Sequence, residues 1–145
     1  MPRSSLFCVS TVHEGIDGRL RAFVERQPVF FVATAPLTGG HVNVSPKGVG
    51  GTFVVVDERT VAYLDITASG AETIAHLREP GNGRITLMFC SFDRTPNVVR
   101  LHGRGRVVSV YDDEYAGWAG RSASVSRTGV RTRGVPCECS ASTPA

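Results

Sequence analysis

The chain has 145 residues, a mass of 15.5 kDa and a formal net charge of +3. This length suits one domain with a real core and is too short for two. Residues 1–115 carry 12 basic and 12 acidic side chains, so the positive excess lies in residues 116–145, with 4 against 1. A neutral body argues against a nucleic-acid-binding protein, which carries a basic stripe on its folded part.

Neither end of the chain nor its cysteines suggest secretion, a membrane or a metal. The N-terminus lacks the apolar core of a secretory signal, and no run approaches the ~20 apolar residues of a membrane span. Cys137 and Cys139 form a C-x-C pair without a second Cys or His pair at zinc spacing. We therefore expect a cytoplasmic protein with no membrane partner, no disulfide framework and no metal site.

The first expected element is a helix capped by Asp17 and running to Gln27. Apolar residues recur at helical spacing before Pro28, which ends the pattern; they are Ile16, Leu20, Phe23 and Val24.

Six strand-like runs follow. They are VFFVATA from Val29, HVNVS from His41, TFVVVD from Thr52, VAYLDI from Val61, RITLMFCSF from Arg84 and NVVRLHGRGRVVSV from Asn97. Most links between them are short, which is typical of antiparallel neighbours. The sequence predicts a mainly β fold, a six-stranded antiparallel barrel with a few short helices.

Two further helices are expected, one between the strand-like runs and one after the last of them. The long link between the fourth and fifth runs predicts a helix of about two turns that begins at Ser69 and Gly70 and ends before Pro80. After Val110, three acidic residues, Asp112, Asp113 and Glu114, suit the first turn of another helix, which would carry Tyr111, Tyr115 and Trp118.

The composition changes at residue 116. Residues 116–145 contain no Leu, Ile, Phe or Met, and such a segment offers little burial to offset the entropy of ordering. We expect a barrel domain at 12–115 followed by a poorly ordered tail. The abrupt change also raises the hypothesis that the reading frame is shifted near residue 116, which the other frames of the coding DNA would test.

The chemically distinctive stretch is HVNVSPKG, which contains the only lysine of the chain, Lys47. It stands at the end of a strand, with Ser45 before it and glycines after it, and an anion such as phosphate is the ligand that this pattern favours. A solvated turn lysine is the alternative.

A second cluster of hydroxyls points to the same kind of ligand. Thr67, Ser69 and Thr73 surround the turn into the second helix, whose first N–H groups could bind a phosphate. Capping of that helix by Ser69 or Thr67 explains the same residues without a ligand. The chain has neither a P-loop nor a dinucleotide-binding glycine motif. Its histidines are scattered, with His76 on a helix face, so no catalytic residue is assigned.

The order of VFFVATA, HVNVSPKG, AYLDITASGAETIAHLRE, GRITLMFCSF and VVRLHGRGRVV resembles the pyridoxamine 5′-phosphate oxidase-like family of FMN-binding split barrels. The resemblance implies a homodimer with FMN where the subunits meet. It implies cofactor contacts for Ser45, Lys47, Tyr63, Leu64, Ser69, Thr73 and Arg100, with His102 as an alternative to Arg100.

The chain departs from the authentic oxidases of this family. They carry an Arg-Lys pair after the serine of the phosphate-binding turn, whereas this chain has Gly70 and Ala71 followed by Glu72. Their carboxyl-terminal arginine and histidine elements also lack a counterpart in residues 116–145, so vitamin B6 oxidation is not expected.

The resulting hypothesis is an FMN-dependent oxidoreductase that transfers a hydride at flavin N5 to or from an unknown small organic substrate. Two alternatives stay open. One is a reductase of the same fold that uses the deazaflavin F420, whose polyglutamate tail favours a basic groove. The other is a non-catalytic barrel that binds flavin or haem in a stress response, or binds no ligand. Dimerisation is also expected because Phe30, Phe53, Tyr63 and Phe92 look like more aromatic surface than a small barrel hides.

Overall fold

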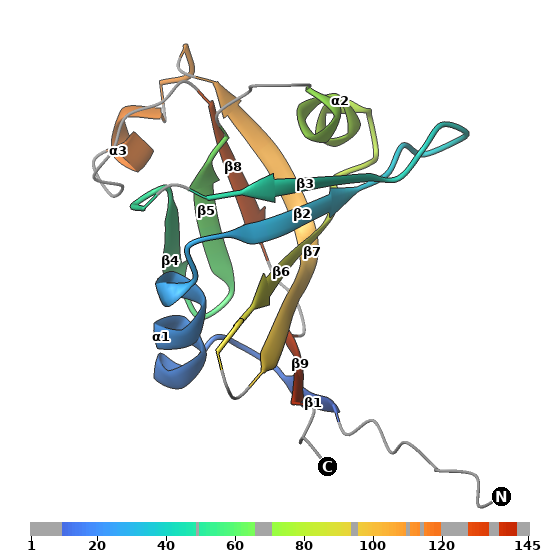
Figure 1. Ribbon diagram of the computed structural model, residues 1–145. Coiled ribbons are helices and arrows are strands. Elements are labelled where there is room, and N and C mark those ends of the chain that lie inside the picture. Colours follow the sequence, from blue (N-terminus) through green and yellow to red (C-terminus); the bar gives the residue numbers. More distant parts are fainter. Residues whose placement is uncertain are drawn as a thin grey trace, which may run out of the picture.

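The computed structural model describes residues 10–48, 50–65, 71–93, 96–109, 111–113, 115–119, 128–133 and 137–141. Within these ranges the chain forms nine strands and three helices, and every paired strand is antiparallel to its neighbour (Figure 1). The fold is therefore mainly β with a few short helices, as the sequence predicts.

The six predicted strands are all present. They are β2 (Phe30–Thr34), β3 (Asn43–Lys47), β4 (Phe53–Asp57), β5 (Thr60–Leu64), β6 (Arg84–Cys90) and β7 (Asn97–Ser109). The largest shift concerns β3, which begins two residues after His41 and includes Pro46. Because β3 ends the path of paired strands, it can accommodate a proline, which sheets tolerate on edge strands.

Three more strands correct the expected number from six to nine within the described ranges. They are β1 (Ser10–His13), β8 (Thr128–Arg133) and β9 (Cys137–Ala141). The strands follow the order β3-β2-β6-β7-β8-β5-β4, and β9 pairs with both β1 and β7. Thus β8 joins the two halves of the sheet, which are β3-β2-β6-β7 on one side and β5-β4 on the other. Its low apolar content hid it from the sequence analysis, because a ladder of backbone hydrogen bonds requires no apolar side chain.

The proposed division into a domain at 12–115 and a tail stays a prediction, although two strands of the sheet lie beyond residue 115. The reading-frame hypothesis is a question for the coding DNA and stays a prediction as well.

The curled sheet is filled by aromatic rings that come from both of its halves. Phe30 of β2 lies 5.4 Å from Phe53 of β4, 5.4 Å from Tyr63 of β5 and 5.2 Å from Phe89 of β6, measured between ring centroids. This corrects the aromatic argument for a dimer. Phe30 and Tyr63 are buried and Phe53 packs against the same core, so of the four aromatic residues only Phe92 is strongly exposed.

The predicted first helix is confirmed as α1 (Gly18–Arg26), and Asp17 caps it by accepting a hydrogen bond from the Leu20 N–H at 2.8 Å. The side chains of Leu20 and Val24 are buried in the core. Glu25 accepts a hydrogen bond from the Val55 N–H of β4. The helix therefore covers β4, which is the other end of the strand path.

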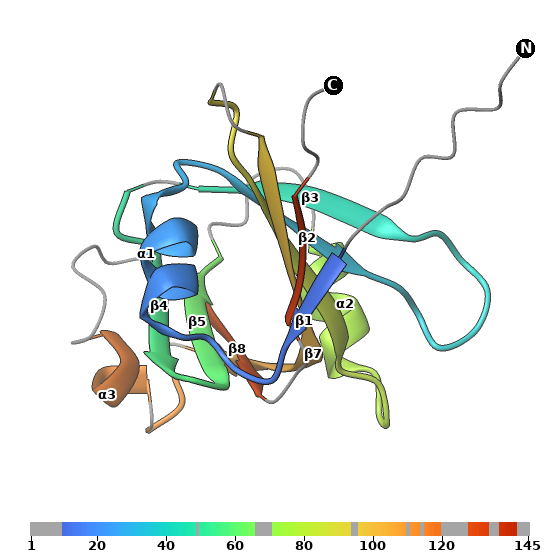
Figure 2. The same cartoon turned by 90° about the horizontal axis from the view of Figure 1, so that it is seen from below.

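The second helix, α2 (Glu72–Arg78), starts slightly later than predicted and packs against β2, β3 and β7. Its N-cap residue is Ala71, which makes no side-chain cap hydrogen bond. The expected caps Ser69 and Thr67 lie outside the described residues. Helix α3 (Tyr115–Ala119) forms close to where a helix was predicted, but it begins later: Tyr111, Asp112 and Asp113, which were expected within it, precede it, and its first turn contains no acidic residue. Viewed from below, α1 and α2 lie at opposite ends of the curled sheet (Figure 2). Among the described helices, none is both long and apolar enough to cross a bilayer.

Candidate functional site

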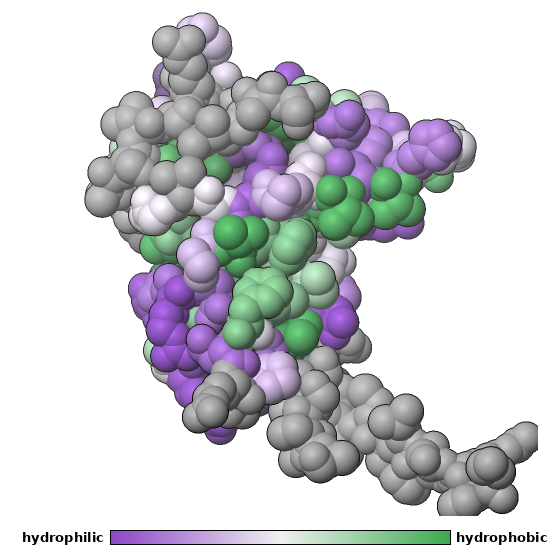
Figure 3. All heavy atoms as spheres, in the orientation of Figure 1, coloured by the Kyte–Doolittle hydropathy of each residue, from purple (hydrophilic) through white to green (hydrophobic). Residues whose placement is uncertain are grey.

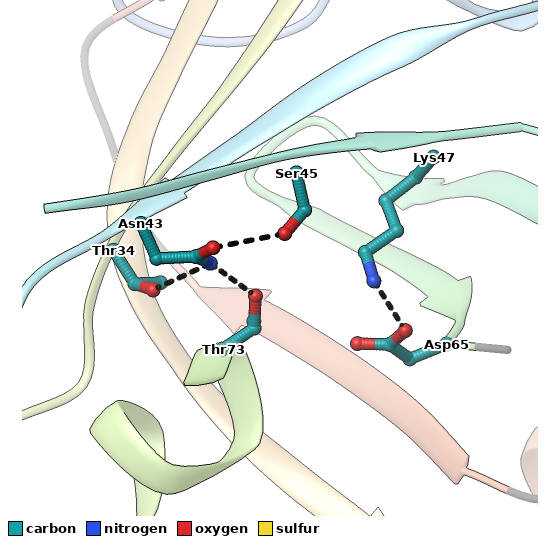
Figure 4. Close-up of polar contacts among 6 residues, drawn as sticks. All are labelled: Thr34, Asn43, Ser45, Lys47, Asp65 and Thr73. Atoms are coloured by element: carbon teal, nitrogen blue, oxygen red, sulfur yellow. Dashed lines mark hydrogen bonds and ion pairs between the residues drawn. The ribbon is translucent and has the colours of Figure 1, made fainter. Parts of the chain in front are cut away.

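A row of polar side chains lines one face of the edge strand β3. Asn43, Ser45 and Lys47 alternate along the strand, so they share a face. The register places them opposite Thr34, Val32 and Phe30 of β2, which are buried in the interior of the sheet. The row therefore faces inward, towards α2 and the end of β5 (Figure 4).

Asn43 is the centre of a hydrogen-bond network in this row. Its side-chain nitrogen donates to the Thr73 hydroxyl at 2.9 Å and to the Thr34 hydroxyl at 3.4 Å, and its side-chain oxygen accepts from the Ser45 hydroxyl at 3.0 Å. Thr73 is buried in the first turn of α2. Two of the predicted site residues, Ser45 and Thr73, are thus brought together by a third residue that the sequence analysis did not single out.

The same network reaches the predicted helix-face residue His76. Its Nδ1 atom lies 3.0 Å from the Thr34 hydroxyl oxygen, within hydrogen-bond distance. Thr34 can donate to His76 while accepting from Asn43, which satisfies both partners. Helix α2 is consequently fixed to β2 and β3 by polar contacts as well as by the buried side chain of Leu77.

Lys47 forms an ion pair with Asp65, the residue that follows β5. The Lys47 Nζ atom donates to Asp65 Oδ1 at 2.5 Å, and the two side chains are 14% and 3% exposed. Gly48 comes next, where an added Cβ would lie 2.2 Å from the Pro28 carbonyl oxygen. A larger residue is therefore excluded by this close approach of the backbone, which keeps the end of β3 against the start of β2.

The side chain of Tyr63 lies in the core, on the same face of β5 as Asp65. Its hydroxyl is buried and has no hydrogen-bond partner among the residues that the structure describes. Burial raises the pKa of Tyr63 well above its usual value, and the negative charge of nearby Asp65 raises it further. The hydroxyl therefore stays protonated at neutral pH.

The remaining predicted site residues do not join this row. Leu64 follows Tyr63 on the opposite face of β5 and is half-buried. Arg100 alternates with the buried residues Val99 and Leu101 of β7, so it lies on the outer face of the sheet. Ser69 lies outside the described residues.

Asp65 and Asn43 are the residues that sequence reasoning missed, and each carried a detectable signal. Asn43 has the same strand parity as Ser45 and Lys47, which predicts a shared face. Asp65 has the same parity as Val61 and Tyr63, so an inward carboxylate followed from the strand pattern. A buried carboxylate requires a cation, and the chain has one lysine.

A separate shallow pocket of about 190 Å³ lies over β2 and β6, with Val42 at its edge. It is lined by Ala33, Thr34, Ala35, Val42, Arg84, Ile85 and Thr86. None of the predicted site residues lines it. Thr86 connects it to the outer face of β7, where the Thr86 hydroxyl lies 3.0 Å from Nδ1 of His102.

Comparison with known sequences identifies relatives for most of the chain. Residues 16–133 match the family model of pyridoxamine 5′-phosphate oxidase. A pyridoxamine 5′-phosphate oxidase family protein of Aspergillus flavus, ustO, is 49% identical over 120 residues, which are 82% of this chain. The aligned part is 47% of the Aspergillus protein, so the chain spans about half the length of this relative.

Solved structures with this fold include proteins of low sequence identity. HupZ of Group A Streptococcus superposes with a TM-score of 0.66 and 19% identity, over 89% of this chain and 99% of that one. The FAD binding protein of Mycobacterium smegmatis gives a TM-score of 0.60 and 17% identity, over 88% and 96% of the two chains. At these identities the likeness concerns the fold.

Proposed function

The chain belongs to the pyridoxamine 5′-phosphate oxidase family, and from this membership we propose that it is a flavin-binding oxidoreductase that uses FMN. The Mycobacterium smegmatis FAD binding protein, which has this fold, supports a flavin. The observation that carries the proposal is the inward row on β3, in which Asn43, Ser45 and Lys47 face the first turn of α2.

The residues of this row fit the uncharged, hydroxyl-rich part of a flavin. Ser45 and Thr73 are hydroxyls that donate and accept, and Asn43 can exchange its present partners for ligand oxygens. Lys47, at the end of β3, would contact the flavin next to the part that Asn43 and Ser45 bind. The ion pair with Asp65 makes Lys47 a poor match for a phosphate dianion, since its charge is already balanced.

A bound flavin would supply hydride transfer at its N5 atom, and the substrate would be a small organic molecule. This chain would contribute binding and orientation. The aromatic cluster around Phe30 would keep water from the inner side of the site. Because the chemistry would belong to the cofactor, the absence of an assigned nucleophile or catalytic histidine is compatible with an enzyme.

A homodimer with the flavin between subunits is part of the proposal. Apolar side chains gather on one face of the molecule over β2, β3 and the hairpin that joins them (Figure 3). Val42 is 69%, Val44 60% and Leu37 49% exposed. Exposed apolar residues grouped along an unpaired edge strand are typical of a protein interface.

The test is an absorbance spectrum of the purified protein after incubation with FMN and desalting. Retained peaks near ~370 and ~450 nm, typical of oxidised flavin, are expected. Ser45→Ala should weaken retention because it removes a hydroxyl of the row, whereas Val12→Ala, at an exposed residue of β1 outside both the row and the proposed interface, serves as the control. Lys47→Ala is an unsuitable control, since it would leave Asp65 buried and unpaired.

The enzyme and the non-catalytic alternatives differ in turnover. The flavin of an oxidoreductase should be reoxidised quickly when the photoreduced protein is mixed with an acceptor such as menadione. A protein that retains flavin without such reoxidation would be a binding protein, and one that retains neither flavin nor haem would contradict the flavin proposal.

The F420 alternative gains support from the arrangement of arginines. Arg84 and Arg104 are exposed at directly opposed positions of β6 and β7, and Arg104 is in turn opposite Arg133 of β8. Arg106 is also exposed, opposite Arg131. The exposed side chains of Arg84, Arg104 and Arg106 would suit a polyglutamate tail. Retention of F420 in preference to FMN in the same desalting experiment would favour this candidate.

A further inference from the structure

Asp65 is placed to control which ligands can use the only lysine of the chain. We propose that Asp65 is a specificity-determining residue: its carboxylate occupies Lys47, excludes phosphate groups from that position and reserves it for an uncharged part of the ligand. The inference rests on the proposed flavin site and concerns which portion of a flavin Lys47 contacts.

The geometry shows that Lys47 is not a free cation. Its Nζ atom is 2.5 Å from Asp65 Oδ1, and Asp65 is only 3% exposed while Lys47 is 14% exposed. The lysine comes from the edge strand β3 and can turn towards a ligand, whereas the aspartate is held in the interior. Any anion that approached the ammonium group would therefore also approach a fixed carboxylate.

The charge of Asp65 acts within a poorly solvated interior. Asp65 follows Tyr63 by two positions, so the two residues lie on the same side of the extended chain. The Asp65 carboxylate contributes to the raised pKa of the Tyr63 hydroxyl. Its field thus extends along the inner face of the sheet. Repulsion between this charge and a phosphate dianion is strong where water does not screen it.

An uncharged acceptor meets no such repulsion. An ammonium group has three N–H donors, and one of them is directed to Asp65. The other two can donate to a neutral oxygen, such as a ring carbonyl or a hydroxyl. The pair consequently fits the carbonyl-bearing ring or the ribityl chain of a flavin better than its phosphate.

The first test compares FMN with riboflavin, which differ by the phosphate group. Dissociation constants for both are measured by flavin fluorescence for the wild type, for Asp65→Asn and for Glu14→Gln. The last is a matched loss of one negative charge at an exposed residue between β1 and α1. Asp65→Asn should raise the preference for FMN over riboflavin by about tenfold or more, and Glu14→Gln should leave it unchanged. An equal preference in the wild type and Asp65→Asn would overturn the proposal.

The second test needs no flavin, and its decisive measurement is made on the wild type. Labelling with ¹³Cε-lysine gives one NMR signal, because the chain has one lysine. Inorganic phosphate in the millimolar range should leave this signal of the wild type in place, and a saturable shift would overturn the proposal. In Asp65→Asn, if it folds, phosphate should shift the signal.

The two tests separate the inference from the function on which it rests. If the wild type binds neither FMN nor riboflavin, the flavin proposal fails, and the phosphate titration still decides whether Asp65 shields Lys47. If flavins bind but phosphate shifts the wild-type lysine signal, the flavin proposal stands and the role of Asp65 is refuted.

Discussion

Phe30 and Tyr63 meet edge to face inside the curled sheet, with ring centroids 5.4 Å apart and an interplanar angle of 77°. The contact joins β2 to β5, two strands that are not neighbours in the sheet. Edge-to-face pairs contribute about 0.5–1.5 kcal/mol beyond the burial of their surface. This ring pair therefore helps to hold the two halves of the sheet together, while the hydroxyl of Tyr63 has no hydrogen-bond partner within the described ranges.

We expect Tyr63→Phe to stabilise the protein. The substitution keeps the ring and removes a buried hydroxyl that has no hydrogen bond to any described residue, and the desolvation of such a hydroxyl costs about 1–3 kcal/mol. The free energy of unfolding in urea should rise by about 1 kcal/mol. Tyr63→Leu, which removes the ring as well, should instead lower it. A loss of stability in Tyr63→Phe would mean that the hydroxyl has a partner, for example a bound water.

The ion pair between Lys47 and Asp65 predicts a characteristic double-mutant cycle. Lys47→Met should lower the free energy of unfolding by about 3–5 kcal/mol, because it leaves the carboxylate of Asp65 buried without its cation. The double variant Lys47→Met/Asp65→Asn removes both charges. It should be more stable than Lys47→Met alone, which equilibrium unfolding would measure. If the second substitution instead lowered stability further, the carboxylate would not be a buried charge that requires Lys47.

The hydrogen bonds of the Glu79 carboxylate predict that the stability of the folded protein falls with pH in the acidic range. Hydrogen bonds from the Leu37 N–H and then from the Asn82 side chain lower the pKa of the Glu79 carboxyl. The unfolded chain therefore binds the proton first as the pH falls, and the contribution of this group is present above pH 4.5. It should decline below that value and be lost once the pH has passed the lowered pKa of the folded state.

The measurement is the melting temperature as a function of pH. Glu79→Gln should have a lower melting temperature than the wild type at neutral pH, and the difference should shrink as the pH falls below 4.5 and passes through the lowered pKa of the folded state. Glu14→Gln is a suitable control, since Glu14 is exposed. A difference that stayed constant across this range would argue against the hydrogen bonds as the source of the shift.

The sequence predicts strands best where side chains alternate between water and core. β2 alternates buried and half-buried residues along its length, and its run was recognised. The same alternation relates Asn43 to Ser45 and Lys47, but only Ser45 and Lys47 were predicted as site residues. Strand β8 carries no such pattern, because its place between β5 and β7 depends on backbone pairing.

The partner of Lys47 was harder to predict than its position. Lys47 and Asp65 are 18 residues apart and belong to segments that do not pair in the sheet. Their contact depends on how the sheet curls, which local spacing does not encode. The sequence therefore predicted the lysine at a strand end but not its aspartate partner, and only the fold shows that the two charges form a pair.

We expect the protein to dimerise through the exposed edge of β3. Val44 is 60% exposed and lies on the outer face of β3, opposite in direction to the inward row of Asn43, Ser45 and Lys47. Val44→Glu would place a charge on the apolar face without touching that row, so a dimer formed there should dissociate. Light scattering coupled to size exclusion at micromolar concentration would measure the mass. Glu14→Gln should keep the mass of the wild type. A wild type of single-chain mass would contradict the dimer outright, and a dimer unaffected by Val44→Glu would place its interface elsewhere.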